Sequence, residues 1–130
     1  MNERRALQIA VAIGSLVPIS AGLAGVIFGP AMVDAMSVPI AADSNYRYLS
    51  ALLLGIGIGF ATTILAIERR TGRVRLLTAI VVIGGLGRLA SLLLRGIPDR
   101  PMLAALVMEL AVTPALAVWQ SRVARRAAGN

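Results

Sequence analysis

The stretch Asp43-Ser44-Asn45-Tyr46-Arg47-Tyr48 leads directly into an apolar run, Leu49 to Ile67, that carries no formal charge. The run holds about 19 residues, close to the roughly 20 that a helix needs to cross a hydrocarbon core about 30 Å thick. Arg47 is therefore predicted at the N-terminal end of a membrane-spanning helix. Small residues follow it on one helix face at intervals of four: Ala51, Gly55, Gly59 and Thr63. Because such spacing lets a second helix approach closely, Arg47 is predicted to face a helix interface.

The composition is typical of a membrane protein. Of the 130 residues, 58% are hydrophobic, against roughly 45–50% in soluble domains. The chain has no cysteine and no histidine, so no disulfide, zinc site or haem ligation through those residues is predicted. We expect no cofactor and no metal. Residues 1–130 are predicted to form a single membrane domain, since the length leaves no room for a second one.

Four apolar runs predict an all-α fold, a bundle of four membrane-spanning helices running up-down-up-down. The predicted spans are about 6–29, 48–67, 76–94 and 102–119. Residues 30–46 form the longest connection. Pro30 predicts a short interfacial helix there, with an apolar side made by Met32, Val33 and Met36. Asp43, Ser44 and Asn45 are all suitable N-caps for the second span, and Asp43 and Arg47 would pair four residues apart if that helix starts early enough.

The arginines predict the orientation. Every one of the 13 basic residues is Arg, and the formal net charge is +7. Three lie on one side of the predicted bundle, Arg47, Arg95 and Arg100, and Arg88 lies within a span. The remaining nine are predicted on the opposite side. The positive-inside rule then places both termini in the cytoplasm, and we expect the bacterial inner membrane. Arginines at the ends of apolar runs also argue against nucleic-acid binding, which the net charge alone would favour.

Arg88 and Glu109 are the only formal charges well inside the predicted spans. Each would cost roughly 2.5–3.5 kcal/mol at a helix centre. Arg88 precedes Arg95 by seven residues and Glu109 follows Met102 by seven, so both are predicted about 10 Å below the outer surface. Opposite charges at equal depth on adjacent antiparallel helices predict an ion pair. That pair could fix the helix register alone, or it could belong to a functional site.

Arg47 favours the functional interpretation of the pair. Arg47 and Arg88 together have more hydrogen-bond donors than Glu109 can accept, so some of these donors remain available to a ligand. The predicted ligand-binding residues are Arg47, Arg88, Glu109, Asp43 and Asn45, with no catalytic residue among them. Such a pocket would open to the outer side and suit a small anionic or polar-headed ligand. The alternative for Arg47 is an interfacial anchor whose charged end reaches toward water.

Several short motifs support a family resemblance. They are Arg5-Ala6-Leu7-Gln8, Asp43-Ser44-Asn45-Tyr46-Arg47-Tyr48-Leu49-Ser50, Gly84-Gly85-Leu86-Gly87-Arg88-Leu89, Gly96-Ile97-Pro98, Glu109-Leu110 and Trp119-Gln120. Together they span almost the entire chain. With them the chain resembles a bacterial family of small four-helix membrane proteins, domain-of-unknown-function family 4345, and more distantly the DoxD-like proteins. The resemblance implies a four-helix membrane fold and supplies no activity. The cysteine-dependent redox chemistry of some DoxD-like proteins does not carry over, since this chain has no cysteine.

The leading functional prediction is a non-enzymatic inner-membrane protein whose polar pocket binds or transports that ligand. The alternative is an accessory or assembly subunit of a larger membrane complex, in which the Arg88–Glu109 pair is purely structural. A proton-coupled exporter ranks third, because it needs an unpaired carboxylate and aromatic residues within the spans. An enzyme ranks last, since no nucleophile–base pair is evident. The expected partners are the lipid bilayer, an anionic small molecule or lipid, and either a second copy or a larger complex.

Overall fold

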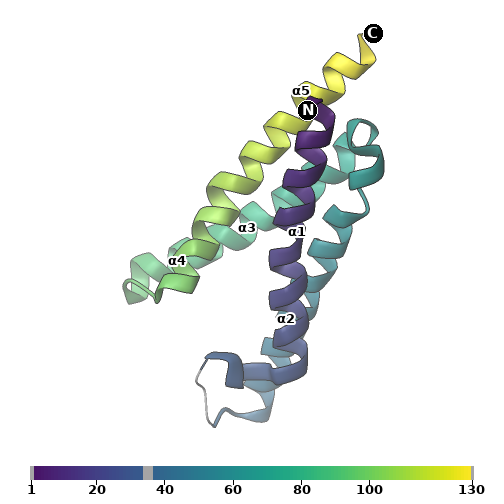
Figure 1. The fold of residues 1–130 in the computed structure, drawn as a ribbon. Coiled ribbons are helices and arrows are strands. Elements are labelled where there is room, and N and C mark those ends of the chain that lie inside the picture. Colours follow the sequence, from purple (N-terminus) through teal and green to yellow (C-terminus); the bar gives the residue numbers. More distant parts are fainter. Residues whose placement is uncertain (1, 34–36, 130) are drawn as a thin grey trace. The chain divides into compact units, whose positions relative to one another are not determined.

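A computed structural model describes residues 2–33 and 37–129, with the backbone alone for residues 32 and 33. Every regular element in these ranges is helical, as the sequence predicts (Figure 1). The α-helices are α1 (Glu3–Phe28), α2 (Ile40–Ala61), α3 (Thr71–Arg95), α4 (Arg100–Val107) and α5 (Thr113–Ala128). Two 3₁₀ segments, η1 (Gly29–Val33) and η2 (Ile64–Arg69), and one π-helical turn, η3 (Met108–Val112), connect or extend them.

Among the described residues, three helical stretches are long and apolar enough to cross a membrane. They are Glu3–Ala31, Thr71–Arg95 and Arg100–Ala128, and an 18-residue segment within each has a mean hydropathy of 2.1, 2.0 and 1.9, respectively. They cover the first, third and fourth predicted spans, as a membrane protein requires. The second predicted span falls mainly on α2, which does not meet the same criterion. Its first two turns contain the polar residues around Asp43 and Arg47, which lower its mean hydropathy.

The second helix begins earlier than the sequence predicts. Its N-cap is Pro39, so the prediction of a cap at Asp43, Ser44 or Asn45 is wrong. Proline holds φ near −65° and ends a preceding element, so it suits a position just before a helix. Because α2 starts at Ile40, Asp43 lies in its first turn. The favourable spacing from Asp43 to Arg47 thereby falls inside a helix.

The second helix also ends earlier than predicted, so residues 48–67 are not one continuous helix. The Thr62 hydroxyl donates to the Gly59 carbonyl at 2.6 Å, and the Thr63 hydroxyl donates to the Phe60 carbonyl at 2.7 Å. Hydroxyls that bond to the backbone compete with the helical ladder. Within η2, Ala66 leaves helical geometry altogether, at φ −126° and ψ 44°. The apolar sequence therefore continues beyond α2 as a turn and a 3₁₀ segment.

The short helix predicted at Pro30 is a 3₁₀ segment, η1, that begins one residue earlier at Gly29. The apolar side predicted for it rests on Met32, Val33 and Met36. Met36 lies outside the described residues, and so do the side chains of the other two.

The chain divides into two compact units. Unit 1 takes in Met1–Ala10 and Leu65–Asn130, and unit 2 takes in Val11–Ile64. Helix α1 therefore contributes its first turns to unit 1 and the rest to unit 2.

In unit 2, α1 packs closely against α2 through glycines. A Cβ atom added at Gly22 would lie 2.5 Å from the Leu54 backbone nitrogen, and one at Gly57 would lie 2.9 Å from the Ile19 backbone nitrogen. Residue numbers rise along α1 as they fall along α2, so the two helices are antiparallel. The close contacts lie at Gly22 and Gly57. The face predicted to meet a second helix ran through Ala51 and Gly55, and that part of the prediction is wrong for Gly55, because nothing lies within 4 Å of a Cβ added there.

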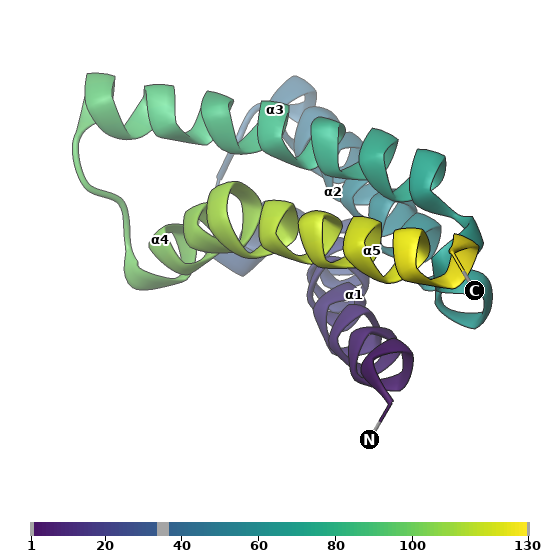
Figure 2. The ribbon, with the colours of Figure 1, turned by 90° about the horizontal axis from the view of Figure 1, so that it is seen from above.

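In unit 1, α4, η3 and α5 follow one another as one continuous helical stretch, and α3 runs antiparallel beside it (Figures 1 and 2). The first turns of α1 join them through contacts near one end. Arg4 pairs with Glu68 at 2.9 Å and donates to the Leu65 carbonyl at 3.0 Å. Glu3 accepts from Trp119 and Arg126 of α5. Leu7, one helical turn after Glu3 on α1, is completely buried.

We predict opposite effects for two glycines of α2 that lie two residues apart. Gly57→Ala should lower the midpoint temperature of unfolding in detergent. The added Cβ would lie only 2.7 Å from the Ile19 side chain and 3.1 Å from the Pro18 side chain of α1. Gly55→Ala should leave the midpoint unchanged or raise it, since nothing lies within 4 Å of that position and alanine favours a helix by roughly 0.5–1 kcal/mol. Equal destabilisation by both changes would contradict this packing.

Candidate functional site

The central feature of unit 1 is a two-point contact between Arg88 of α3 and Glu109 of η3. The Arg88 Nε donates to Glu109 Oε2 at 3.0 Å, and its Nη2 donates to Oε1 at 3.1 Å. The Nη1 also donates to the Met102 thioether sulfur at 2.9 Å. A fork of parallel hydrogen bonds fixes orientation as well as charge, which a single contact would not do. The two helices are thereby held in one register.

Gly85 brings the two backbones close enough for this contact. It is buried, and it lies about one turn before Arg88 on α3. A Cβ there would lie 2.7 Å from Leu110 Cδ2 and 2.9 Å from Glu109 Cβ. A larger residue would therefore push η3 away from α3. The close approach of α3 to η3 and the Arg88–Glu109 ion pair therefore both depend on the absence of a side chain at Gly85.

The π-helical turn that carries Glu109 has a local cause. Pro114, in the first turn of α5, has no N–H to offer the Leu110 carbonyl, and its ring crowds that carbonyl. The Thr113 N–H instead bonds the Met108 carbonyl, five residues back, and the Thr113 hydroxyl donates to the same oxygen at 2.7 Å. Single π turns within α-helices recur at functional sites. Here the turn holds the carboxylate that faces Arg88.

The pair is not sealed from its surroundings. The Arg88 side chain is 34% exposed and that of Glu109 18% exposed. Of the five N–H groups of a guanidinium, three of Arg88 are used in the contacts above. Within the described residues, two remain without an acceptor. On the same helix, nothing lies within 4 Å of a Cβ added at Gly84 or Gly87.

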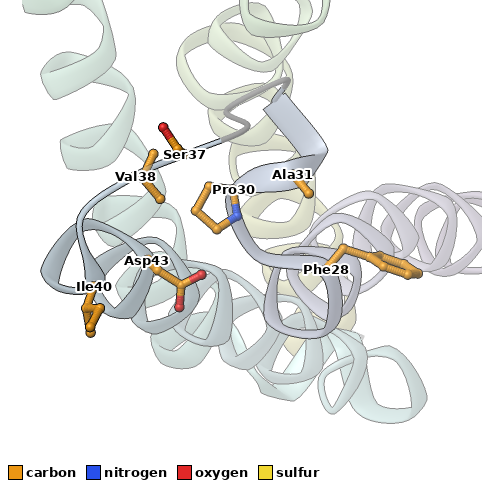
Figure 3. A pocket seen from close by; sticks show the side chains of 7 residues that line it. All are labelled: Phe28, Pro30, Ala31, Ser37, Val38, Ile40 and Asp43. Atoms are coloured by element: carbon orange, nitrogen blue, oxygen red, sulfur yellow. The ribbon is translucent and has the colours of Figure 1, made fainter.

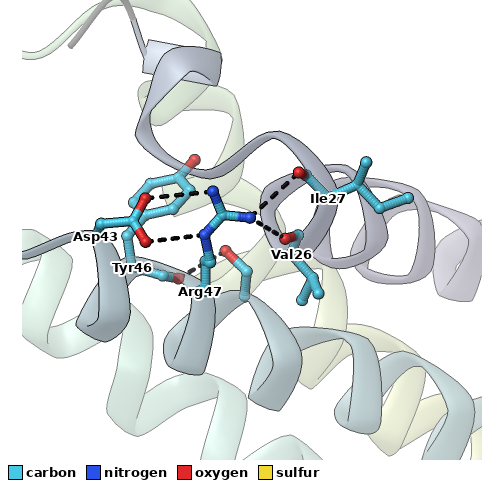
Figure 4. Close-up of polar contacts among 6 residues, drawn as sticks. Val26, Ile27, Asp43, Tyr46 and Arg47 are labelled. Carbon is cyan, nitrogen blue, oxygen red and sulfur yellow. Dashed lines mark hydrogen bonds and ion pairs between the residues drawn. The ribbon is translucent and has the colours of Figure 1, made fainter. Parts of the chain in front are cut away.

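Unit 2 has its own polar cluster, formed by Arg47 and Asp43 of α2 (Figure 4). Arg47 Nε donates to Asp43 Oδ2 at 2.9 Å, and Nη2 donates to Oδ1 at 3.3 Å. The Nη1 donates to the carbonyls of Val26 and Ile27 at 2.6 and 3.2 Å. These carbonyls belong to the last turn of α1, where the helix leaves its acceptors unpaired. Arg47 therefore ties the end of α1 to the start of α2, and four of its five N–H groups are used.

Gly29 completes this cluster. It follows α1 directly with φ at +63°, a left-handed conformation in which helices commonly end. A Cβ there would lie 2.5 Å from Arg47 Nη2 and 3.0 Å from Asp43 Oδ1. A glycine is needed both for the turn and for the space that the guanidinium occupies.

A shallow hollow of about 400 Å³ lies beside this cluster (Figure 3). Among the described residues that line it, Asp43 is the only charged one, and both of its oxygens accept from Arg47. Asn45 is exposed on α2 and does not line the hollow. The lining residues are Phe28, Pro30, Ala31, Ser37, Val38, Ile40 and Asp43. This surface offers no basic side chain to an anion.

The residues predicted for one pocket thus form two clusters, each within its own unit. Arg88 and Glu109 meet in unit 1, and Arg47 and Asp43 meet in unit 2. Sequence reasoning did not foresee the roles of Met102 or of Gly29. The spacing of Met102, seven residues before Glu109, could have revealed it, because two helical turns return it to the same face.

Gln120 is a further polar residue that the sequence-based prediction gave no role. It is completely buried in unit 1. Its Nε2 donates to the Ile67 carbonyl at 2.7 Å and to the Thr71 hydroxyl at 2.9 Å. Its Oε1 is buried without a hydrogen-bond partner among the described residues. Gln120 supplies a donor to a carbonyl of η2, and so joins that irregular segment to α5.

Comparison with protein families gives one match. The model described as Domain of unknown function (DUF4345) matches residues 6–120, which include both polar clusters and Gln120. Neither the curated proteins nor the solved structures give a match.

The Arg88–Glu109 contact predicts energetic coupling. Arg88→Leu and Glu109→Gln should each lower stability in detergent, because each leaves a polar group without its partner. The double variant should be more stable than the sum of the two losses predicts. We expect a coupling energy of about 1 to 3 kcal/mol, measured by a double-mutant cycle on thermal or denaturant unfolding.

The matched control is Arg95→Leu, which changes an exposed arginine at the end of the same helix. Combined with Glu109→Gln, it should show no coupling. Strict additivity of the Arg88 and Glu109 changes would show that the contact contributes nothing to stability.

Proposed function

Because the chain belongs to the family Domain of unknown function (DUF4345), and because its helices fit a membrane protein, we propose that it is a non-enzymatic, multi-pass protein of the bacterial inner membrane. Its site is the Arg88–Glu109 pair, which lies within the membrane and binds a small anionic or polar-headed molecule. Transport of that molecule would use the same site.

The proposed topology has four crossings with both termini in the cytoplasm. Three crossings correspond to the stretches that are long and apolar enough. The fourth is α2 together with the apolar residues that follow it: residues 49–61 of α2 extend about 20 Å at 1.5 Å per residue, and residues 62–67 continue the apolar run beyond the helix. The polar first turns of α2 would lie at the outer interface, where Arg47 and Asp43 meet water and headgroups. The excess of arginines in the N-terminal segment, the loop after α2 and the C-terminal tail supports this orientation.

The observation that carries the ligand proposal is that Arg88 does not use all of its N–H donors within unit 1. A purely structural pair within a membrane would be expected to satisfy and cover its donors, since unsatisfied polar groups there are costly. Arg88 instead keeps two N–H groups and one third of its side-chain surface free in unit 1. Glu109 holds the guanidinium in a fixed plane. The free edge could then grip a carboxylate or phosphate oxygen.

Arg47 takes a different part in this proposal from the one that the sequence favoured. Its donors are nearly all used by Asp43 and by the end of α1. We therefore assign it to holding α1 and α2 together in unit 2. Arg88 and Glu109 remain as the ligand-binding residues.

One observation favours the second candidate, an accessory subunit of a larger membrane complex. Gly84 and Gly87 leave open positions on α3 near Arg88. Small residues of this kind let a helix of another protein pack closely. In that case the free edge of Arg88 would meet a carbonyl or carboxylate of the partner.

The test is native mass spectrometry of the full chain released from bacterial membranes in mild detergent, with Arg88→Lys as the variant. The wild type should carry a bound anionic molecule of at most a few hundred daltons. Arg88→Lys should lose it, because an ammonium keeps the charge but lacks the planar fork. Arg95→Lys, at the exposed end of the same helix, should retain it.

A wild type that carries no small molecule but has a stoichiometric protein partner would overturn the proposal in favour of the accessory subunit. Retention of the molecule by Arg88→Lys would remove Arg88 from the site.

A further inference from the structure

A second concave surface lies in unit 1, between α3 and α5. It has a volume of about 310 Å³ and is lined by Arg75, Ala117, Val118, Ser121 and Arg125. Residues 117, 121 and 125 recur every four positions, so they share one face of α5. The wall is mainly apolar, with one arginine from each helix. We call this surface the basic groove.

The two arginines of the basic groove have no acidic partner. Neither Arg75 nor Arg125 makes an ion pair with any described residue, and both are exposed. The carboxylates at this end of unit 1 are already engaged. Glu3 pairs with Arg126, and Glu68 pairs with Arg4. The groove therefore carries uncompensated positive charge.

The groove also lies where apolar sequence gives way to charge. Arg75 directly precedes the apolar part of α3, and Arg125 lies six residues beyond Trp119, the predicted end of the last span. In the proposed topology this is the cytoplasmic interface. Ala117 and Val118 would then lie at the depth of acyl chains, while Arg75 and Arg125 would lie at the level of headgroup phosphates. Basic pockets between spanning helices on this side of a membrane bind anionic lipid headgroups.

We propose that the basic groove is a binding site for one anionic phospholipid. Arg75 and Arg125 contact the phosphate, and the wall formed by Ala117, Val118 and Ser121 receives the upper part of an acyl chain. This site is separate from the Arg88–Glu109 pair. It rests on the proposed placement of α3 and α5 in a membrane, but not on any ligand at that pair.

The experiment titrates the detergent-solubilised full chain with phosphatidylglycerol or phosphatidylcholine of the same acyl chains, and measures the bound fraction by native mass spectrometry. The wild type should bind phosphatidylglycerol at least tenfold more tightly. Each arginine near an anionic headgroup contributes about fivefold. The double variant Arg75→Gln with Arg125→Gln should therefore bind about 25-fold more weakly.

The matched control is Arg122→Gln, which is on the same helix as Arg125 and also exposed, but outside the groove. It should change phosphatidylglycerol binding less than twofold. Ser121→Phe should weaken binding at least fivefold with both arginines kept, because the ring fills the groove. Glycerol phosphate, the headgroup chemistry without a chain, should not displace the lipid. Monodisperse size-exclusion profiles would show that each variant is folded.

Three results would overturn the basic groove as a lipid site. They are equal binding of the two lipids, equal losses from all arginine changes, and displacement by glycerol phosphate alone. An acidic protein that binds in place of lipid and is released by the same double variant would also overturn it. A chain that leaves the membrane fraction without detergent would instead contradict the membrane placement itself.

Discussion

A charge in an apolar helix has to be neutralised by a partner at the same level, and this requirement organises unit 1. Arg88 and Glu109 satisfy it with two hydrogen bonds of 3.0 and 3.1 Å. Several neighbouring features serve the same contact. Gly85 removes a side chain that would keep the backbones apart. Pro114 disrupts the ladder beside Glu109, so that the glutamate sits in a widened turn. Register, backbone spacing and helix irregularity thus converge on one ion pair.

Unit 2 uses the same principle at a helix end, where the unpaired groups are carbonyls. Arg47 bonds two carbonyls of the last turn of α1 while Asp43 neutralises it. The side chain is about 40% exposed, so screening by water keeps the energetic contribution of the charges small. The contribution of Arg47 is mainly geometric, since it fastens two helices across the connection that follows α1. Gln120 acts similarly in unit 1, where it bonds a carbonyl of η2.

The sequence predicted those features that depend on counting residues along a helix. Equal distances from the helix ends brought Arg88 and Glu109 together, and a spacing of four brought Asp43 and Arg47 together. It failed where several local solutions compete. Asp43, Ser44 and Asn45 were all suitable N-caps, yet Pro39 starts α2 earlier. Thr62 and Thr63 look like ordinary members of an apolar run, and only their hydroxyl bonds to the backbone show why the helix ends. The burial of Gln120 depends on η2, whose irregular path no sequence period reveals.

We propose that the chain crosses the membrane four times, with the Arg88–Glu109 pair inside. Because the chain has no cysteine, single cysteines can report topology without background. The decisive measurement is labelling of intact cells with a membrane-impermeant maleimide, using Ser37→Cys, Gly72→Cys, Ile97→Cys and Gly129→Cys. We expect labelling at positions 37 and 97 from outside, and at positions 72 and 129 only after the membrane is opened. Labelling of position 129 from outside would place the C-terminal end on the outer side of the membrane and would contradict this topology.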